Sequence, residues 1–250
     1  MAGGMIVARL GSVPLTLAGC GAALSGVTLL LFALLFRFLV VQKAETEGAP
    51  RRGWFLAAVG YGLLPAIAVW KVFEGFCIPA AGREVFPPLT GVPWVTENGL
   101  WLPARLEMVL ALAGFLGITA WLMARKEAPM PGPDLFGTSL CVWAALRIMT
   151  DCFYARSLWI ADGIHWMRYG CCAVLLISLA GWTVRRARKT KSAGQTVMDW
   201  ASALIGTAGI VLCTEGWIPN LSEIGNLAVI AGCAALLLTV TLLAGSDSRK

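Results

Sequence analysis

Long apolar runs separated by short polar segments dominate the sequence. A membrane-crossing α-helix needs about 20 predominantly apolar residues, whereas strands of membrane β-barrels alternate apolar with polar positions. The runs are long and do not alternate, so they favour helices, whose backbone groups are satisfied internally in lipid. Seven candidate spans occur, in chain order: Val13–Phe36, Trp54–Trp70, Leu106–Met123, Leu135–Thr150, Met167–Val184, Val197–Thr214 and Asn226–Ala244.

The segments between the runs hold the proline and glycine residues that end helices, as in "EGAPRRG", "AGREVFPPLTGVP", "APMPGPD" and "EGWIPN". The second and fourth runs are short, and we expect both helices to extend into their flanks. Pro65 lies inside the second run, where lipid-embedded helices tolerate a kink if a neighbour satisfies the freed carbonyl. The predicted fold class is an all-α, polytopic integral membrane bundle of about seven transmembrane helices.

Composition supports the membrane prediction, and the placement of charge orients it. Hydrophobic residues make up 58% of the chain and charged residues 14%, against about a quarter charged in soluble domains. Lysine and arginine gather in alternate connections, and cytoplasmic loops carry such an excess. These residues are Arg37, Lys43, Arg51, Arg52, Arg125, Lys126, Arg185, Arg186, Arg188, Lys189, Lys191, Arg249 and Lys250. We therefore predict the N-terminus outside and the C-terminus in the cytoplasm. The lysines and arginines of the predicted cytoplasmic face account for most of the net charge of +6, which therefore gives no reason to expect nucleic-acid binding.

Several short motifs match functional patterns, but each has a simpler structural interpretation. "LAGC", ending at Cys20, matches a lipobox, but the longest apolar run follows it, so a first membrane span is favoured over a cleaved signal. "GCGAALSG", residues 19–26, indicates close helix packing. The eight cysteines form no CxxC pair, and a disulfide between Cys77 and Cys152 is left open. One histidine and no cysteine–histidine cluster argue against a metal site, and we predict no cofactor.

Arg147 lies within the otherwise apolar fourth run, where a guanidinium costs about 3 kcal/mol or more. A structural interpretation is that it reaches the interface or pairs with Asp151, one helical turn away. A functional interpretation is that it faces a cavity and meets an anion. The common anion at that depth is a phospholipid phosphate, which suits the fork of arginine. The residues alone leave both interpretations open.

Two segments carry a resemblance to a known family. "LPARLEM", residues 102–108, opens one run, and "LRIMTDCFYAR", residues 146–156, lies in the next. Residues 100–191 resemble the C-terminal half of the prolipoprotein diacylglyceryl transferases. In that family a "hP-S-Q-L-Y-E" type segment is followed by a helix with an "F-R-h-h-x-E-F-F-R" type motif. A weaker similarity covers Gly60–Glu74. The family's His-Gly-Gly segment and its "G-R-x-G-N-F-x-N-x-E" type signature are absent from the sequence.

The resemblance implies that a prolipoprotein cysteine thiol displaces glycerol phosphate from phosphatidylglycerol. In that reaction Arg147 would clamp the phosphate, and Glu107 or Asp151 would orient Arg147. Outer-face support would come from Arg105, Arg156 or Arg168. His165 is the candidate general base by residue type alone, and anchoring of its helix at the interface is the alternative. The implied division is a transferase-like part, residues 1–192, and two added transmembrane helices, residues 193–250.

The sequence therefore predicts a multi-pass protein of the bacterial cytoplasmic (inner) membrane that binds a phospholipid phosphate at the outer face. The expected lipid is phosphatidylglycerol. The expected activity is transfer of its diacylglyceryl group to a cysteine thiol of a lipobox-bearing prolipoprotein, in lipoprotein biosynthesis. The alternative is a non-catalytic protein that binds a phospholipid or a membrane partner and has lost the catalytic motifs.

Overall fold

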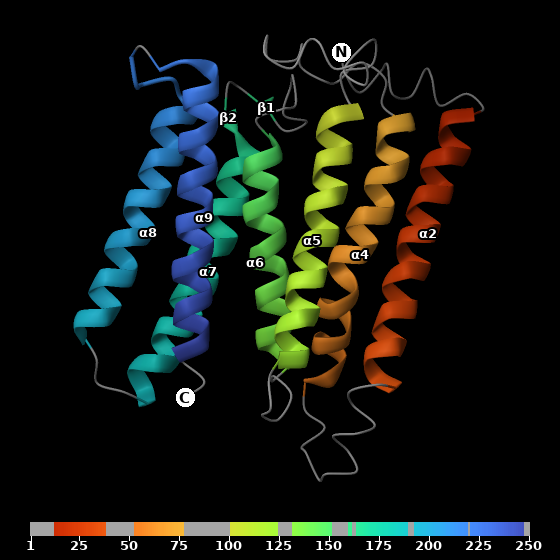
Figure 1. Ribbon diagram of the computed structural model, residues 1–250, viewed down its shortest axis with the longest axis horizontal. Coiled ribbons are helices and arrows are strands. Elements are labelled where there is room, and N and C mark those ends of the chain that lie inside the picture. Colours follow the sequence, from red (N-terminus) through yellow and green to blue (C-terminus); the bar gives the residue numbers. More distant parts are fainter. Residues whose placement is uncertain are drawn as a thin grey trace. The chain divides into compact units, whose positions relative to one another are not determined.

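The computed structural model describes residues 13–38, 53–77, 101–124, 132–151, 160–161, 164–189, 193–219 and 221–247. This part of the chain forms seven helices and one short antiparallel strand pair (Figure 1). The helices are α2 (Val13–Phe36), α4 (Trp54–Cys77), α5 (Trp101–Ala124), α6 (Gly132–Asp151), α7 (Trp166–Lys189), α8 (Ala193–Thr214) and α9 (Glu223–Asp247). Strand β1 (Ile160–Ala161) pairs with β2 (Ile164–His165) just before α7. The prediction of a helical chain is confirmed, and α4 and α6 extend into their flanks as expected.

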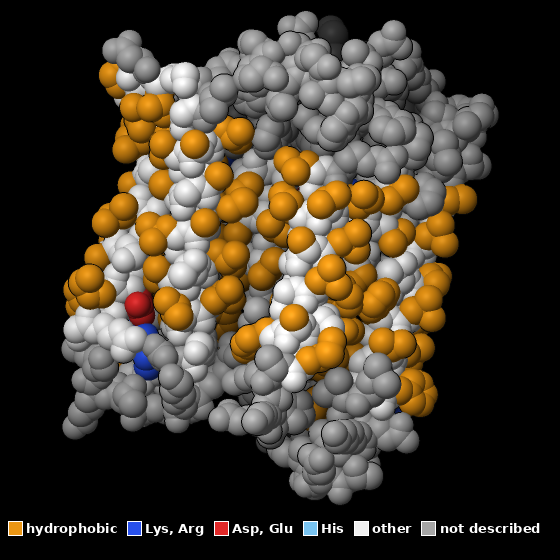
Figure 2. All heavy atoms as spheres, in the orientation of Figure 1, with side chains coloured by type: hydrophobic (Ala, Val, Ile, Leu, Met, Phe, Trp, Pro, Cys, Tyr) orange, Lys and Arg blue, Asp and Glu red, His pale blue; other side chains and the backbone are white. Residues whose placement is uncertain are grey.

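Five of these helices, α4, α5, α7, α8 and α9, are long and apolar enough to cross a membrane. Helix α2 contains a shorter apolar stretch, Cys20–Phe36. Hydrophobic side chains cover most of the visible helical surface, and charged ones appear toward the helix ends (Figure 2). Apolar residues on the outside as well as the inside are typical of helices that face lipid. The helices thus support a multi-pass membrane protein, while the number of seven spans and the direction of the termini stay predictions.

The chain divides into two compact units. Of the described residues, the first unit contains α2, α4, α5 and α6 up to Ser139, and the second contains α6 from Leu140, the strand pair, α7, α8 and α9. This division concerns packing. The predicted division at residue 192 concerns a resemblance, so it stays a prediction.

Aromatic side chains hold the first unit together. Phe115 of α5 meets Phe32 of α2 edge-on with ring centroids 5.2 Å apart, and Tyr61 of α4 lies 5.0 Å from Phe115. Phe36 packs on the same tyrosine at 5.2 Å. Such pairs contribute about 0.5–1.5 kcal/mol beyond their burial. The hydroxyl of Thr119 also donates to the hydroxyl oxygen of Tyr61 at 3.3 Å, which joins α5 to α4.

The closest backbone approaches in the first unit occur at two glycines of α4. A Cβ on Gly62 would lie 2.7 Å from the Leu29 carbonyl oxygen of α2, and one on Gly60 would lie 2.6 Å from Cα of Phe136 in α6. The expectation from "GCGAALSG" was that α2 would supply such contacts. At Gly26 a Cβ would meet nothing within 4 Å, so for this residue the expectation is wrong. The neighbouring Ser25 does contact α4, because its hydroxyl donates to the Ala66 carbonyl oxygen at 2.8 Å.

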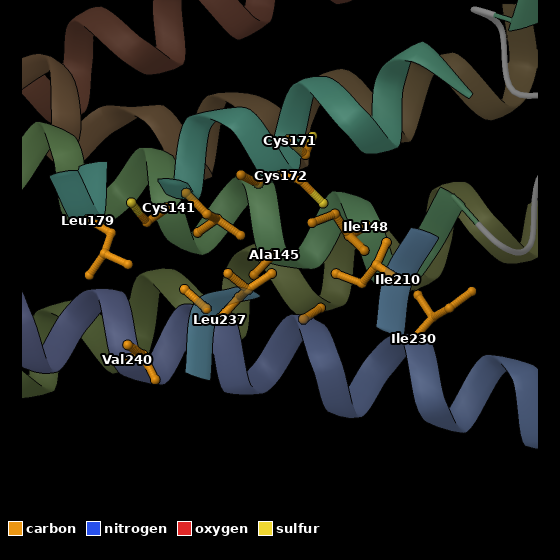
Figure 3. Packing of buried hydrophobic residues seen from close by; sticks show 14 of the residues in the cluster. Cys141, Ala145, Ile148, Cys171, Cys172, Leu179, Ile210, Ile230, Leu237 and Val240 are labelled. Carbon is orange, nitrogen blue, oxygen red and sulfur yellow. The ribbon is translucent and has the colours of Figure 1, made fainter. Parts of the chain in front are cut away.

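The core of the second unit is built from one face of each of its helices (Figure 3). On α6 the core residues are Cys141, Ala144, Ala145 and Ile148, which follow the three- and four-residue spacing of a helix face. Leu179 of α7, Ile210 of α8 and Leu237 of α9 complete the same cluster. The cluster therefore joins this face of α6 to α7, α8 and α9.

Candidate functional site

Arg147 and Asp151 lie one turn apart on α6, close to its C-terminal end. Both are buried, with 3% of Arg147 and 1% of Asp151 exposed. The Nη2 atom of Arg147 lies 3.8 Å from Oδ1 of Asp151, which is an ion pair but too long for a hydrogen bond. The pairing that the sequence predicted as one alternative is therefore present. It does not exclude the other alternative, an anion at the same guanidinium.

Arg168 of α7 makes the shorter contact with the same carboxylate. Its Nε atom donates to Oδ2 of Asp151 at 3.0 Å, and its Nη1 atom donates to the hydroxyl of Thr214, on α8, at 2.9 Å. Only 8% of Arg168 is exposed. One guanidinium thus joins three helices, α6, α7 and α8. These bonds use the Nε and Nη1 atoms of the guanidinium.

Asp151 supplies one negative charge to two guanidiniums, so the trio of Arg147, Asp151 and Arg168 carries a formal charge of +1. Two buried cations around one carboxylate are costly unless further acceptors satisfy them. The arrangement is suited to an anion, because arginine offers paired donors that match phosphate or carboxylate oxygens. We refer to this trio as the Arg147–Asp151–Arg168 cluster.

Hydrogen bonds from neighbouring residues hold the C-terminal end of α8, which contacts this cluster through Thr214. The hydroxyl of Tyr169 donates to the carboxylate of Glu215, which directly follows α8. The amide of Asn226, on α9, donates to the Cys213 carbonyl at 3.1 Å. Gly216, with φ of +67°, then turns the chain away from the helix. Bonds from Gly216 N to Cys213 O and from Trp217 N to Leu212 O form the Schellman motif that such a glycine permits. The end of α8 that presents Thr214 is therefore held by its neighbours.

The cluster lies at one end of an uncharged stretch of α7. No charged residue occurs between Arg168 and Arg185, and Arg186 follows. At 1.5 Å per residue, the 18 positions from Arg168 to Arg186 span about 27 Å. This length is close to the about 30 Å of a bilayer's hydrocarbon core. If α7 crosses a membrane, Arg168 and Arg186 lie near its two boundaries.

Glu107 has a different described partner from the one the sequence suggested. Its Oε2 atom lies 3.0 Å from Nζ of Lys71, and both side chains are buried between α5 and α4 in the first unit. The Arg147–Asp151–Arg168 cluster belongs to the second unit. A role for Glu107 in orienting Arg147 therefore stays a prediction.

The other predicted site residues fall outside the described side chains. Arg105 is in α5 and His165 is in β2, where it pairs with Ile160, but only their backbones are described. Arg156 lies outside the described residues, as does Cys152, the predicted partner of Cys77. Their predicted roles remain predictions. Within the described ranges, no group of three or more His, Cys, Asp or Glu side chains is placed to hold a metal ion.

Lys71 and Thr214 are the polar partners that sequence reasoning missed. A signal for the first was present. Lys71 lies six residues before the end of α4 at Cys77, and Glu107 lies six residues after the start of α5 at Trp101 (77 − 71 and 107 − 101). In antiparallel neighbours these positions have the same depth, so the opposite charges meet. No comparable signal pointed to Thr214, because its contact depends on how α7 and α8 pack.

Comparisons of the chain with protein-family models, with curated proteins and with solved structures find no match.

Proposed function

We propose that this chain is a multi-pass membrane protein that binds the phosphate group of an anionic phospholipid at the Arg147–Asp151–Arg168 cluster. The observation that carries the proposal is the meeting of two buried guanidiniums, from α6 and α7, on a single carboxylate. Buried charges inside membrane spans are rare and mark functional sites by default. The expected lipid is phosphatidylglycerol.

Depth supports a lipid phosphate over other anions. The cluster lies at the end of a stretch of α7 whose length matches the hydrocarbon core, which is the level at which phospholipid phosphates begin. The acyl chains can then remain beside apolar helix faces while the phosphate meets the arginines. The asymmetry of lysine and arginine favours the outer face of the membrane for this end. The resemblance implies that the membrane is a bacterial cytoplasmic membrane.

The three residues have different parts in this proposal. Arg168 is held by Asp151 and by Thr214, so it is the fixed cation. Arg147 shares Asp151 at the longer distance of 3.8 Å. Asp151 lowers the repulsion between the two guanidiniums before a lipid arrives. Arg147 is proposed as the principal phosphate ligand because its forked donors match phosphate oxygens.

The second candidate function is diacylglyceryl transfer, and the ordered series of motifs in residues 100–191 favours it. In this reaction the cysteine sulfur forms a bond to a glycerol carbon, and the bond from that carbon to the phosphate oxygen breaks. Glycerol phosphate leaves with the electron pair, and the thiol proton passes to a base, for which His165 is the candidate. The arginines would stabilise the charge on the leaving group. The missing His-Gly-Gly segment and Asn/Glu signature favour binding without turnover.

Equilibrium binding of fluorescent phosphatidylglycerol to the purified chain tests the proposal. Arg147→Gln is expected to weaken binding about 10- to 100-fold, because it removes charge-assisted hydrogen bonds. Arg147→Lys keeps the charge but loses the forked pair of donors. Its affinity for the lipid is expected to lie between those of the parent and of Arg147→Gln. Arg37→Gln, which removes an exposed arginine directly after α2, is the matched control and should bind as the parent does. Parental affinity in Arg147→Gln would overturn the proposal.

The same preparation separates binding from transfer. Incubation with a lipobox peptide and labelled phosphatidylglycerol yields a thioether-linked peptide if the chain is a transferase, and mass spectrometry detects that product. Lipid binding without product, in protein whose helical circular dichroism is intact, identifies the non-catalytic alternative.

A further inference from the structure

An exposed carboxylate lies directly beside the proposed phosphate site. Arg168 of α7 donates to the hydroxyl of Thr214 on α8 at 2.9 Å. The next residue of each segment makes a second contact, in which the hydroxyl of Tyr169 donates to the carboxylate of Glu215. Arg168 is buried, whereas Glu215 is exposed. Binding of a phosphate by the arginines does not require this carboxylate, so it is available for a separate role.

The backbone of Glu215 is held at the end of α8. Its amide donates to the Val211 carbonyl oxygen at 2.9 Å, so Glu215 completes the last helical turn. Gly216, with φ of +67°, turns the chain away directly after it. The carboxylate is therefore presented from a helix end, and the bond from Tyr169 orients it.

The depth of Glu215 matches the outer part of a phospholipid headgroup. The stretch of α8 that is long and apolar enough to cross a membrane is Gly194–Thr214, so Glu215 is the first residue beyond it. Consecutive residues of a helix differ by about 1.5 Å along its axis. A phosphate level with Arg168 and Thr214 therefore has Glu215 on its aqueous side. The alcohol esterified to the phosphate projects toward that side.

A carboxylate at this place selects a headgroup by its hydrogen-bond donors. An ionised carboxylate only accepts hydrogen bonds and has about four acceptor sites, so the bond from Tyr169 is compatible with further donors. A cationic headgroup would be disfavoured, because the neighbouring trio of two arginines and one aspartate carries a formal charge of +1. A hydroxyl group is neutral and donates to the carboxylate without that repulsion. The arrangement therefore favours an alcohol that carries hydroxyl groups.

We infer that Glu215 accepts hydrogen bonds from the glycerol hydroxyls of a phosphatidylglycerol headgroup whose phosphate is bound by the arginines of the Arg147–Asp151–Arg168 cluster. This role rests on the proposed function, because it requires the phosphate at that cluster. Glu215 is the specificity-determining residue. Tyr169 is a positioning residue, because it acts on the headgroup only through the direction of the carboxylate.

Binding of phosphatidylglycerol and of phosphatidylethanol to the purified chain tests this role. Both lipids carry one negative charge, but the ethanol headgroup has no hydroxyl, so the ratio of their affinities cancels general effects of charge. The parent should prefer phosphatidylglycerol about fivefold, and Glu215→Ala should abolish the preference. Glu215→Gln, which keeps an uncharged acceptor, and Tyr169→Phe, which removes the orienting hydroxyl, should each give an intermediate ratio.

Two further comparisons show whether the preference belongs to Glu215. Asp199→Asn removes a carboxylate near the opposite end of α8 and should leave the ratio unchanged. Phosphatidylethanolamine carries a cationic headgroup and should bind the parent more weakly than phosphatidylglycerol. A preference that persists in Glu215→Ala, or a parent that favours phosphatidylethanolamine, would overturn the role of Glu215.

The same measurements separate this role from the proposed function. If the parent binds phosphatidylglycerol and phosphatidylethanol with equal affinity, and Arg147→Gln weakens both, the phosphate site stands and only the role of Glu215 is wrong. If the parent binds neither lipid, both proposals are wrong.

Discussion

Replacing Asp151 with asparagine tests how the Arg147–Asp151–Arg168 cluster is held together. The substitution keeps the shape of the side chain but leaves two guanidiniums without their shared carboxylate. Removing one partner of a buried ion pair costs about 3–5 kcal/mol, because the remaining charge stays buried. Asp151 is 1% exposed and meets both arginines, so we expect a loss in this range. Thr150→Val is the matched control, since the Thr150 hydroxyl bonds mainly within its own helix, and should cost less than about 1 kcal/mol.

Double-mutant cycles then distinguish the two arginines. Arg168 donates to Asp151 at 3.0 Å, so the coupling between Asp151→Asn and Arg168→Met should be about 2–3 kcal/mol. Arg147 lies 3.8 Å from the carboxylate without a hydrogen bond to it, so its coupling should be about 1 kcal/mol. Reversible unfolding in mixed micelles, followed by tryptophan fluorescence, gives each free energy. Equal couplings, or a larger one for Arg147, would refute this account of the cluster.

Three further predictions concern stability, measured as free energy of unfolding in the same micelles. Lys71→Met should cost about 3–5 kcal/mol, because it removes the ammonium group 3.0 Å from the buried Glu107 carboxylate. Lys71→Met/Glu107→Leu should recover most of that loss, and a double variant no more stable than the single one would contradict this prediction. Gly60→Ala should destabilise the protein, because the added Cβ would lie 2.6 Å from the Cα of Phe136. Gly181→Ala should leave the stability unchanged, because a Cβ there would meet nothing within 4 Å. Gly216→Ala should cost about 1 kcal/mol, because φ of +67° disfavours a Cβ, and an unchanged stability would argue against that turn.

The helices were predictable because their signal is local. Long apolar runs mark the helices directly, and five of the described helices are long and apolar enough to cross a membrane. Pro65, a helix breaker elsewhere, lies within α4 as expected. The pair of Arg147 and Asp151 was also predictable, because side chains four positions apart on one helix are neighbours. Such features need no knowledge of how the helices pack.

The contacts between helices were not predictable in this way. Apolar residues face both lipid and core, so hydrophobicity does not show which face of α6 meets α7. Arg168 was named only as outer support, although it makes the shortest described contact with Asp151. Its bond to Thr214 depends on the crossing of α7 and α8. Similarly, the close approaches at Gly60 and Gly62 depend on partners that no local pattern identifies.

The proposed role of Arg147 and Arg168 is to hold a phospholipid phosphate. An experimental structure of the chain in bilayer nanodiscs containing phosphatidylglycerol is the most direct test of this role. We expect a headgroup with two acyl tails at the α6–α7 end, with phosphate oxygens within hydrogen-bond distance of Arg147 Nη atoms. Well-resolved Arg147, Asp151 and Arg168 side chains with no headgroup beside them would contradict it.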